Sequence, residues 1–404
     1  MTDHSVSASV EAAGAGRLVE AGRLFTLLAG PAIVGLIAMA IASITPRIAA
    51  EFGGANAALA AQLVMTLPAV MVLVGAPVGG WLADRVGHRP VLLTALAVYA
   101  LAGAAGLFIT DFATLMASRL LLGLAGGAIQ PVCLALIGRY YDGVRRERVL
   151  GFVVTVSSIL AIAGLTLGGA IADLLGWRAA FSLYLVGAVV FLTALRCVPA
   201  GGPIPAARGK GVPGAGALAG LWPVYALVTM LGIGMFLPAI QAPFLLEAKG
   251  VGGATVASLP GSACAAVATL SSALYGRLRR RWSIRGVSVL TALSMGGGAV
   301  LAAQGGLAPT VLGCALIGIG AGLVEPNAGA TILSRTPEAV HARALGLLIT
   351  ALYLGQFLNP LLFAALRDLL GPFAGIEAAG AALLLTGALL LAAQRSRIAA
   401  PIGA

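Results

Sequence analysis

Charged side chains are scarce in this sequence of 404 residues. Only 10% of the residues are Asp, Glu, Lys or Arg, whereas 60% are hydrophobic and the mean hydropathy is +1.02. Soluble domains contain about 25% charged and about 45–50% apolar residues. The composition therefore excludes an ordinary soluble domain and favours a chain that lies mostly within a membrane.

Cysteine and histidine are also rare, with four and three copies. The cysteines fall in separate apolar stretches and the histidines form no cluster, so neither type has the spacing of a zinc site. The phosphate-binding sequence Gly-x4-Gly-Lys-Ser/Thr does not occur, which argues against ATP hydrolysis by this chain. No nucleophile–base–acid set stands out either. We expect neither an enzyme nor a bound cofactor or metal.

Long apolar runs dominate the chain instead. A helix that crosses a bilayer needs about 20 mainly apolar residues, whereas the strands of a membrane barrel are short and alternate in polarity. The sequence therefore predicts an all-α integral membrane protein with twelve transmembrane helices. The runs are roughly 24–45, 57–82, 90–109, 113–137, 150–173, 179–198, 221–246, 254–276, 286–304, 308–333, 344–366 and 373–394.

The basic residues lie mostly on one side of this topology. Of 25 Lys and Arg, 20 fall in the termini and the even-numbered loops, four at the opposite face, and one, Arg119, inside a run. This asymmetry predicts that both termini are cytoplasmic. The net charge of +11 then reflects topology and attraction to acidic membrane lipid rather than a nucleic-acid partner. The 23 Arg against 2 Lys are typical of a GC-rich bacterial genome, so we expect the bacterial cytoplasmic membrane.

The chain divides into two similar halves. Residues 123–131 (GLAGGAIQP) match 318–326 (GIGAGLVEP) at a shift of 195, and two further blocks share this shift. The segment 199–220, rich in Pro, Gly and Ala, separates the halves as a linker. The predicted divisions are a cytoplasmic tail at 1–22, a six-helix bundle at 23–198, the cytoplasmic linker at 199–220, a second six-helix bundle at 221–396 and a tail at 397–404.

The stretch 80–89 (GWLADRVGHR) joins the second and third runs. Its pattern Gly-x-Leu-x-Asp-Arg-x-Gly-x-Arg resembles the signature loop of the major facilitator superfamily. The resemblance implies two pseudo-symmetric six-helix bundles, a substrate site at their interface, and an acid that latches the halves on the cytoplasmic side. Asp84 ends its helix, where its charge opposes the helix dipole, so it needs a positive partner such as Arg139 or the helix end near Ala344. The predicted latch residues are Gly80, Asp84, Arg85, Gly87, Arg89 and Arg139.

Several polar residues lie within the runs. Arg119 has the spacing of the superfamily's fourth-helix motif, whose arginine faces the central cavity; the alternative is that its side chain reaches the outer headgroups. Any one of the others is also explained by hydrogen bonds between helices. The predicted substrate contacts are Arg119, Gln130, Asn327, Tyr353, Gln356 and Asn359.

Glu325 is the carboxylate predicted to lie deepest in a run, about eight residues from its cytoplasmic end. Burial raises the pKa of a carboxyl group toward the range in which it exchanges protons at cellular pH. We therefore predict Glu325 as the proton-coupling residue. The alternatives are a permanently protonated structural residue or one that is paired with a neighbouring helix.

Two further motifs resemble those of twelve-helix drug:proton antiporters. Residues 151–169 match the antiporter motif of helix 5, except that Leu160 replaces a glycine and Leu165 the proline. Residues 176–181 (GWRAAF) resemble the corner that follows that helix. The resemblance implies a monomeric transporter that exports a small organic, amphiphilic solute in exchange for protons. The alternatives are proton-linked uptake or facilitated passage of an organic anion held by Arg119, and a non-transporting membrane sensor or scaffold.

Overall fold

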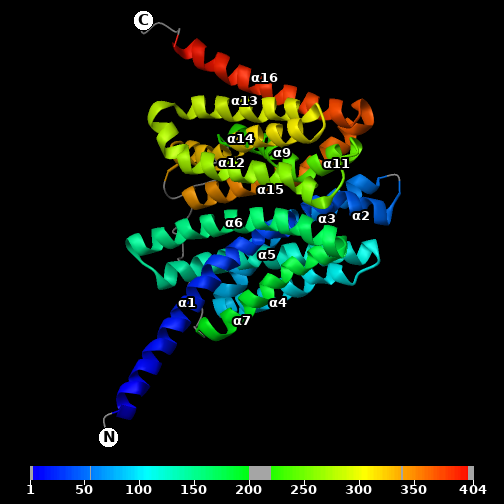
Figure 1. Cartoon of the computed structure of the whole chain (residues 1–404). Coiled ribbons are helices and arrows are strands. Elements are labelled where there is room, and N and C mark those ends of the chain that lie inside the picture. Colours follow the sequence, from blue (N-terminus) through cyan, green and yellow to red (C-terminus); the bar gives the residue numbers. More distant parts are fainter. Residues whose placement is uncertain (1–2, 55, 200–219, 338–339, 399–404) are drawn as a thin grey trace, which may run out of the picture. The chain divides into compact units, whose positions relative to one another are not determined.

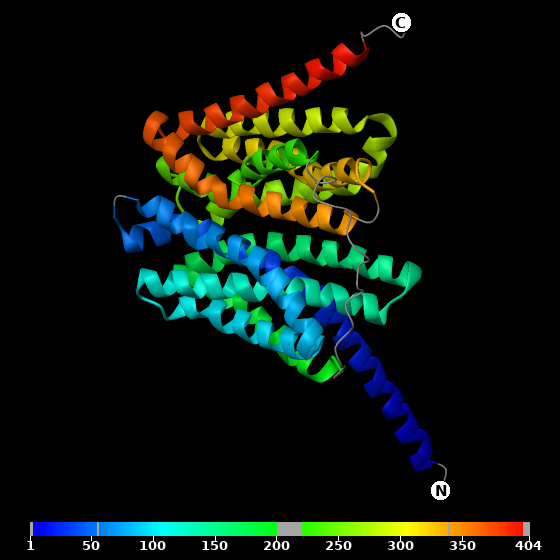
Figure 2. The same ribbon diagram turned by 180° about the vertical axis from the view of Figure 1, so that it is seen from behind.

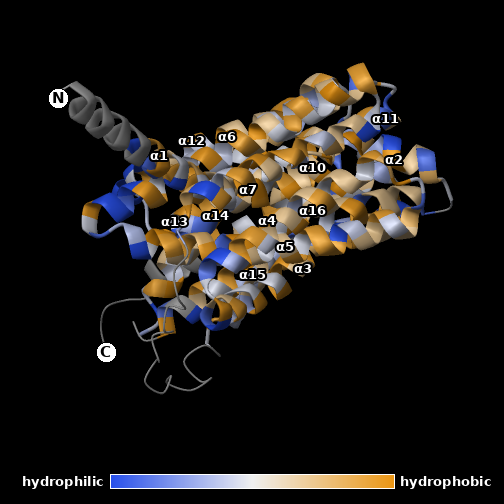
Figure 3. Cartoon of the chain, turned by 90° about the horizontal axis from the view of Figure 1, so that it is seen from below, coloured by the Kyte–Doolittle hydropathy of each residue, from blue (hydrophilic) through white to orange (hydrophobic). Residues whose placement is uncertain are grey.

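The computed structural model describes residues 3–54, 56–199, 220–337 and 340–398 (Figure 1). In these ranges the chain is helical and has no strand, and twelve helical segments are long and apolar enough to cross a membrane. The predicted fold class, an all-α membrane protein with twelve spans, is confirmed. Figure 3 shows that hydrophobic residues follow the middles of these helices and that hydrophilic residues lie mostly near their ends.

The helices follow the apolar runs closely. Three short 3-10 segments, η1 (Ala42–Ile44), η2 (Ala105–Leu107) and η3 (Trp177–Leu185), extend or link them. The α-helices are α1 (Asp3–Met39), α2 (Thr45–Phe52), α3 (Ala57–Val86), α4 (His88–Ala104), α5 (Phe112–Tyr140), α6 (Gly143–Leu175), α7 (Val186–Cys197), α9 (Trp222–Met235), α10 (Leu237–Ile240), α11 (Ala242–Ala248), α12 (Ala254–Arg281), α13 (Ile284–Ala303), α14 (Leu307–Leu333), α15 (His341–Leu370) and α16 (Pro372–Ile398).

The helix bounds repeat along the chain. Shifting α5 by 195 residues gives 307–335, against Leu307–Leu333 for α14. Shifting α3 by 196 gives 253–282, against Ala254–Arg281 for α12. The same shift takes the start of α4 to residue 284, where α13 begins. The internal repeat seen in the sequence is therefore a repeat of whole helices.

The chain forms two compact units whose borders differ from those of the predicted halves. Unit 1 comprises 1–40, 71–161 and 181–208, and unit 2 comprises 41–70, 162–180 and 209–404. Unit 2 thus includes parts of spans from the first half, namely the start of α3 and the end of α6. Of the predicted linker, 200–219 lie outside the described residues, and the division at 199–220 stays a prediction.

In unit 1, α1, α4, α5 and α7 pack around an apolar core. Two buried tyrosines tie these helices together: the hydroxyl of Tyr99 donates to the Ile33 carbonyl at 2.6 Å, and that of Tyr184 donates to the Ile37 carbonyl at 2.7 Å. Each hydroxyl thus satisfies its hydrogen-bonding requirement in an interior without water. These bonds fix α1 against α4 and η3.

In unit 2, α13 packs closely against both α14 and α16 (Figure 2). Gly298 on α13 and Gly313 on α14 face each other so closely that a Cβ atom on either would overlap the other's carbonyl oxygen. Small residues permit such an approach, and close packing replaces the hydrophobic effect as the stabilising contact between helices in lipid. Glycine at these two positions therefore fixes the spacing of the helices.

Candidate functional site

The predicted latch motif forms the tight turn between α3 and α4 in unit 1. Gly87 has φ 97°, a conformation that other residues rarely adopt, and α4 starts at the next residue. The Arg85 guanidinium stacks over the Trp81 ring, 4.0 Å from its centroid. Arg89 donates to the Leu195 carbonyl of α7 at 2.8 Å. Arg89 therefore ties the turn to α7 of its own unit, whereas Arg85 packs along α3 itself.

Asp84, the acid of the motif, lies exposed in the last turn of α3. In the part of the chain that the structure describes, the ion pairs do not include Asp84, so the expected pair with Arg139 is not formed. The roles of Gly80, Asp84 and Arg139 in a latch stay predictions.

Arg119 lies differently from the orientation that the resemblance implied. Its side chain is 0% exposed and donates to the carbonyls of Ala102 and Gly103 at 2.7 and 2.9 Å. These carbonyls belong to the last turn of α4, which has no further helical partners for them. The guanidinium also lies over the rings of Phe181 and Tyr184, 4.9 and 5.2 Å from their centroids. Within unit 1, Arg119 thus caps α4, and its role as a substrate contact stays a prediction.

Glu325 lies in the interior of α14, in unit 2. Its side chain is accessible from outside the protein, although many protein atoms lie around it. Among the described residues it has no hydrogen bond or ion pair. It lies one turn beyond Gly322, whose backbone abuts Ala268 of α12. An electrostatic interaction links its carboxylate to the half-buried Tyr353 of α15. Two of the predicted site residues, Glu325 and Tyr353, therefore lie within electrostatic range of each other.

A chain of buried amides runs through unit 2. The Gln62 side chain of α3 donates to Gln241 at 3.0 Å, and Gln241 donates to Asn359 of α15 at 2.8 Å. Asn359 in turn donates to the Ile233 carbonyl at 2.7 Å. Asn359 is 0% exposed, and Gln356, one turn earlier, is 4% exposed. The predicted contact Asn359 is therefore part of a network that links three separate segments of unit 2.

Asp173, at the end of α6, is a functional candidate without a predicted role. Its carboxylate accepts from the Ala254 N–H at 2.9 Å and from the Thr255 N–H at 2.8 Å, and it pairs with Arg47. A carboxylate at a helix N-terminus satisfies the free N–H groups and is favoured by the helix dipole. Asp173 thus caps the start of α12 from another span, at the opposite end of α12 from its basic segment 277–281.

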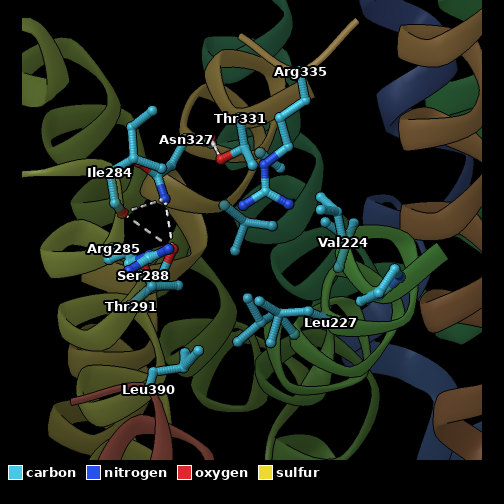
Figure 4. Close-up of a pocket in the computed structure, with 15 residues that line it drawn as sticks. Val224, Leu227, Ile284, Arg285, Ser288, Thr291, Asn327, Thr331, Arg335 and Leu390 are labelled. Atoms are coloured by element: carbon cyan, nitrogen blue, oxygen red, sulfur yellow. Dashed lines mark hydrogen bonds between the residues drawn. The ribbon is translucent and has the colours of Figure 1, made fainter. Parts of the chain in front are cut away.

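Asn327 lines a separate cavity of about 410 Å³ between α9, α13 and α14 (Figure 4). Its side-chain amide donates to the Ile284 carbonyl at 3.1 Å and to the Ser288 hydroxyl at 2.9 Å. Gln130, the last of the predicted contacts, lies half-buried on α5 in unit 1. Asn327 lies two residues after Glu325 on α14, whereas Gln130 belongs to the other unit.

The sequence of residues 27–360 matches the family description Major Facilitator Superfamily. The chain belongs to the major facilitator superfamily. This family is one of membrane transporters, so the prediction that the chain is not an enzyme is confirmed, and a non-transporting scaffold is not supported.

Similar superfamily proteins include drug exporters. The chain is 28% identical to a multidrug transporter protein of Bacillus subtilis over 36% of its own length and 27% of the relative. It is 28% identical to a chloramphenicol resistance protein of Streptomyces lividans over 46% of its length and 47% of the relative. It is 35% identical to a cephamycin export protein of Amycolatopsis lactamdurans over 25% and 21% of the two chains. The chain thus aligns with less than half of each relative.

Solved structures share the superfamily fold. A POT family transporter superposes with a TM-score of 0.73 at 14% identity, covering 94% of this chain and 99% of the other. A peptide transporter of the POT family gives a TM-score of 0.74 at 17% identity, covering 92% and 94%. At this identity the likeness concerns the fold alone.

Proposed function

We propose that this superfamily member exports a small organic, amphiphilic solute across the bacterial cytoplasmic membrane in exchange for protons. The names of the relatives support export, since they include drug and antibiotic resistance proteins. The observation that carries the proton coupling is Glu325, an accessible carboxylate without a partner among the described residues, inside a membrane-spanning helix.

The chemistry follows from the cost of charge in a membrane. An ionised carboxylate away from water is unfavourable by several kcal/mol, so Glu325 binds a proton when water is excluded from it. When water reaches it again, the proton is released. The Tyr353 hydroxyl interacts electrostatically with Glu325, so its environment changes when Glu325 gains or loses a proton. A solute that competes with the proton for this region would leave as the proton enters.

Everted membrane vesicles that contain the full chain provide the test. With an imposed pH gradient, adding chloramphenicol or ethidium should release protons from the wild-type vesicles, and a pH-sensitive dye reports this. Glu325→Gln mimics the protonated form and should abolish the release. Glu377→Gln is the matched control. Glu377 lies on α16, is exposed, and accepts a hydrogen bond from the Gln304 side chain at 3.2 Å.

The result distinguishes a role of Glu325 in proton coupling from a purely structural role. Loss of proton release in Glu325→Gln, with counterflow of the same solute retained, supports the proposal. Equal proton release from Glu325→Gln and the wild type would remove Glu325 as the coupling site. Uptake of an organic anion held by Arg119 is not favoured, because the guanidinium is fully buried and donates to carbonyls of its own unit.

A further inference from the structure

The cavity between α9, α13 and α14 lies within unit 2 and has a polar end and an apolar end. Arg285 and Arg335 lie where α13 begins and α14 has just ended, and Figure 4 shows the Arg335 side chain extending between Thr331 and Val224. Leu227, Leu231 and Val324 line the deeper part. Thr291 also lines the cavity and lies six residues after Arg285, which corresponds to ~9 Å along the helix. The cavity thus extends from a cationic mouth into the apolar part of the bundle.

Both cations at the mouth are available to a ligand. In the described ranges neither guanidinium joins an ion pair or donates a hydrogen bond, and both side chains are exposed. Arg89, the counterpart of Arg285 at a shift of 196, instead donates to the Leu195 carbonyl at 2.8 Å. The arginine of the first half therefore stabilises its own bundle, whereas that of the second half has no such partner among the described residues.

The polar lining of the cavity is also specific to the second half. Ser288 and Thr291 of α13, and Asn327 and Thr331 of α14, line the cavity. At shifts of 196 and 195 their counterparts in the first half are apolar and buried. These counterparts are Leu92, Ala95, Val132 and Leu136. A cavity of about 410 Å³ with two exposed arginines at its mouth is thus not a necessary consequence of the repeated fold.

We propose that this cavity binds an acidic phospholipid, with the phosphate between Arg285 and Arg335 and part of an acyl chain against Leu227 and Leu231. Charge complementarity favours this occupant, because guanidinium groups bind phosphate in pairs of hydrogen bonds. The apolar depth favours a lipid over a water-soluble anion. Basic pockets between helices, at the basic end of a membrane protein, are where acidic headgroups bind. The site lies within unit 2, and Glu325 is not among the residues that line it.

Native mass spectrometry of the full-length chain in detergent, titrated with dioleoylphosphatidylglycerol, measures the binding. Removing two arginine–phosphate contacts should weaken it about 30-fold, since each basic residue near a membrane surface contributes a factor of about five. The test variant is Arg285→Gln/Arg335→Gln. The matched control is Arg277→Gln/Arg280→Gln, which removes the same charge from exposed residues at the same end of unit 2 but outside the cavity. We expect the control to bind as the wild type does.

A second variant tests the apolar part. Ser288→Leu/Thr331→Leu introduces the leucines of the first half and should fill the cavity while both arginines remain. We expect it to lose phosphatidylglycerol binding and to keep its unfolding temperature, which shows that the chain is folded.

Three results would overturn the proposal. The first is equal weakening by the arginine variant and its control, which would mean a general attraction of charge. The second is equal binding of dioleoylphosphatidylcholine, which would mean filling by any lipid. The third is displacement of phosphatidylglycerol by sn-glycerol 1-phosphate at the same concentration, which would mean a site for a soluble anion.

Discussion

Asp173 accepts hydrogen bonds from both the backbone N–H and the hydroxyl of Thr255, at 2.8 and 2.7 Å, so the end of α6 caps the first turn of α12. Close packing accompanies these bonds, since a Cβ atom on Gly169 of α6 would lie 2.5 Å from the Ala254 carbonyl oxygen. A span of the first half and a span of the second half are thereby joined at this end of unit 2. A transporter that alternates between two states has to break such a contact in each cycle.

We expect Asp173→Ala to favour the state in which this contact is open. Losing a capping side chain costs about 1–2 kcal/mol, which corresponds to roughly a tenfold shift in the equilibrium. Ser258, one turn further along α12, is 1% exposed, so Ser258→Cys should react slowly with an impermeant maleimide. In a background without the native cysteines, Asp173→Ala should raise this rate about tenfold by the same equilibrium shift.

The control for this change is Asp368→Ala. Asp368 is the repeat counterpart of Asp173 at a shift of 195, and it is exposed and outside the ion pairs of the described residues. It should leave the labelling rate unchanged. An unchanged rate in Asp173→Ala as well would show that the cap does not hold the closed state.

The amide chain predicts a measurable coupling between two spans. Gln62 and Gln241 are both buried and share one hydrogen bond. Hydrogen bonds between membrane helices contribute about 0.6 kcal/mol on average, with a maximum of about 1.7. In a double-mutant cycle of Gln62→Ala and Gln241→Ala, the free energies of unfolding should therefore be non-additive by an amount in this range. Additive effects within the error of denaturant titrations would contradict the network.

Arg119→Lys tests whether this arginine is structural. Lysine keeps the charge but lacks the planar guanidinium, whose Nη2 donates to both the Ala102 and the Gly103 carbonyl while its plane lies over two aromatic rings. We expect the free energy of unfolding to fall by about 1–3 kcal/mol, because buried acceptors lose their donors. The control is Arg178→Lys, at a partly exposed pair with Glu51, where the loss should stay below about 1 kcal/mol. If Arg119→Lys unfolds like the wild type yet loses solute binding, the residue contacts the solute.

The spans and their repeat could be predicted from the sequence because each span is a continuous apolar run, and apolar length is what a bilayer requires. The partners of Arg119 could not be predicted, because they are backbone carbonyls at the end of α4, and carbonyls leave no signature in sequence. The role of Asp173 was missed for a related reason. Its partners are N–H groups of a helix that starts 81 residues later, and only the fold brings them to it.

Asp84→Asn should slow transport without lowering the stability of the protein. Asp84 is exposed near the end of α3, where a negative charge opposes the helix dipole and costs about 0.3–1 kcal/mol. No ion pair within the described residues offsets this cost. Removing the charge should therefore leave the unfolding temperature unchanged or raise it slightly. If Asp84 latches one state of the cycle, as the motif implies, solute export in vesicles should nevertheless slow several-fold.

The control is Asp142→Asn. Asp142 is an exposed acid between α5 and α6, and its substitution should leave export unchanged. A structural role for Asp84 would instead make stability and export fall together, and export at the wild-type rate would exclude the latch.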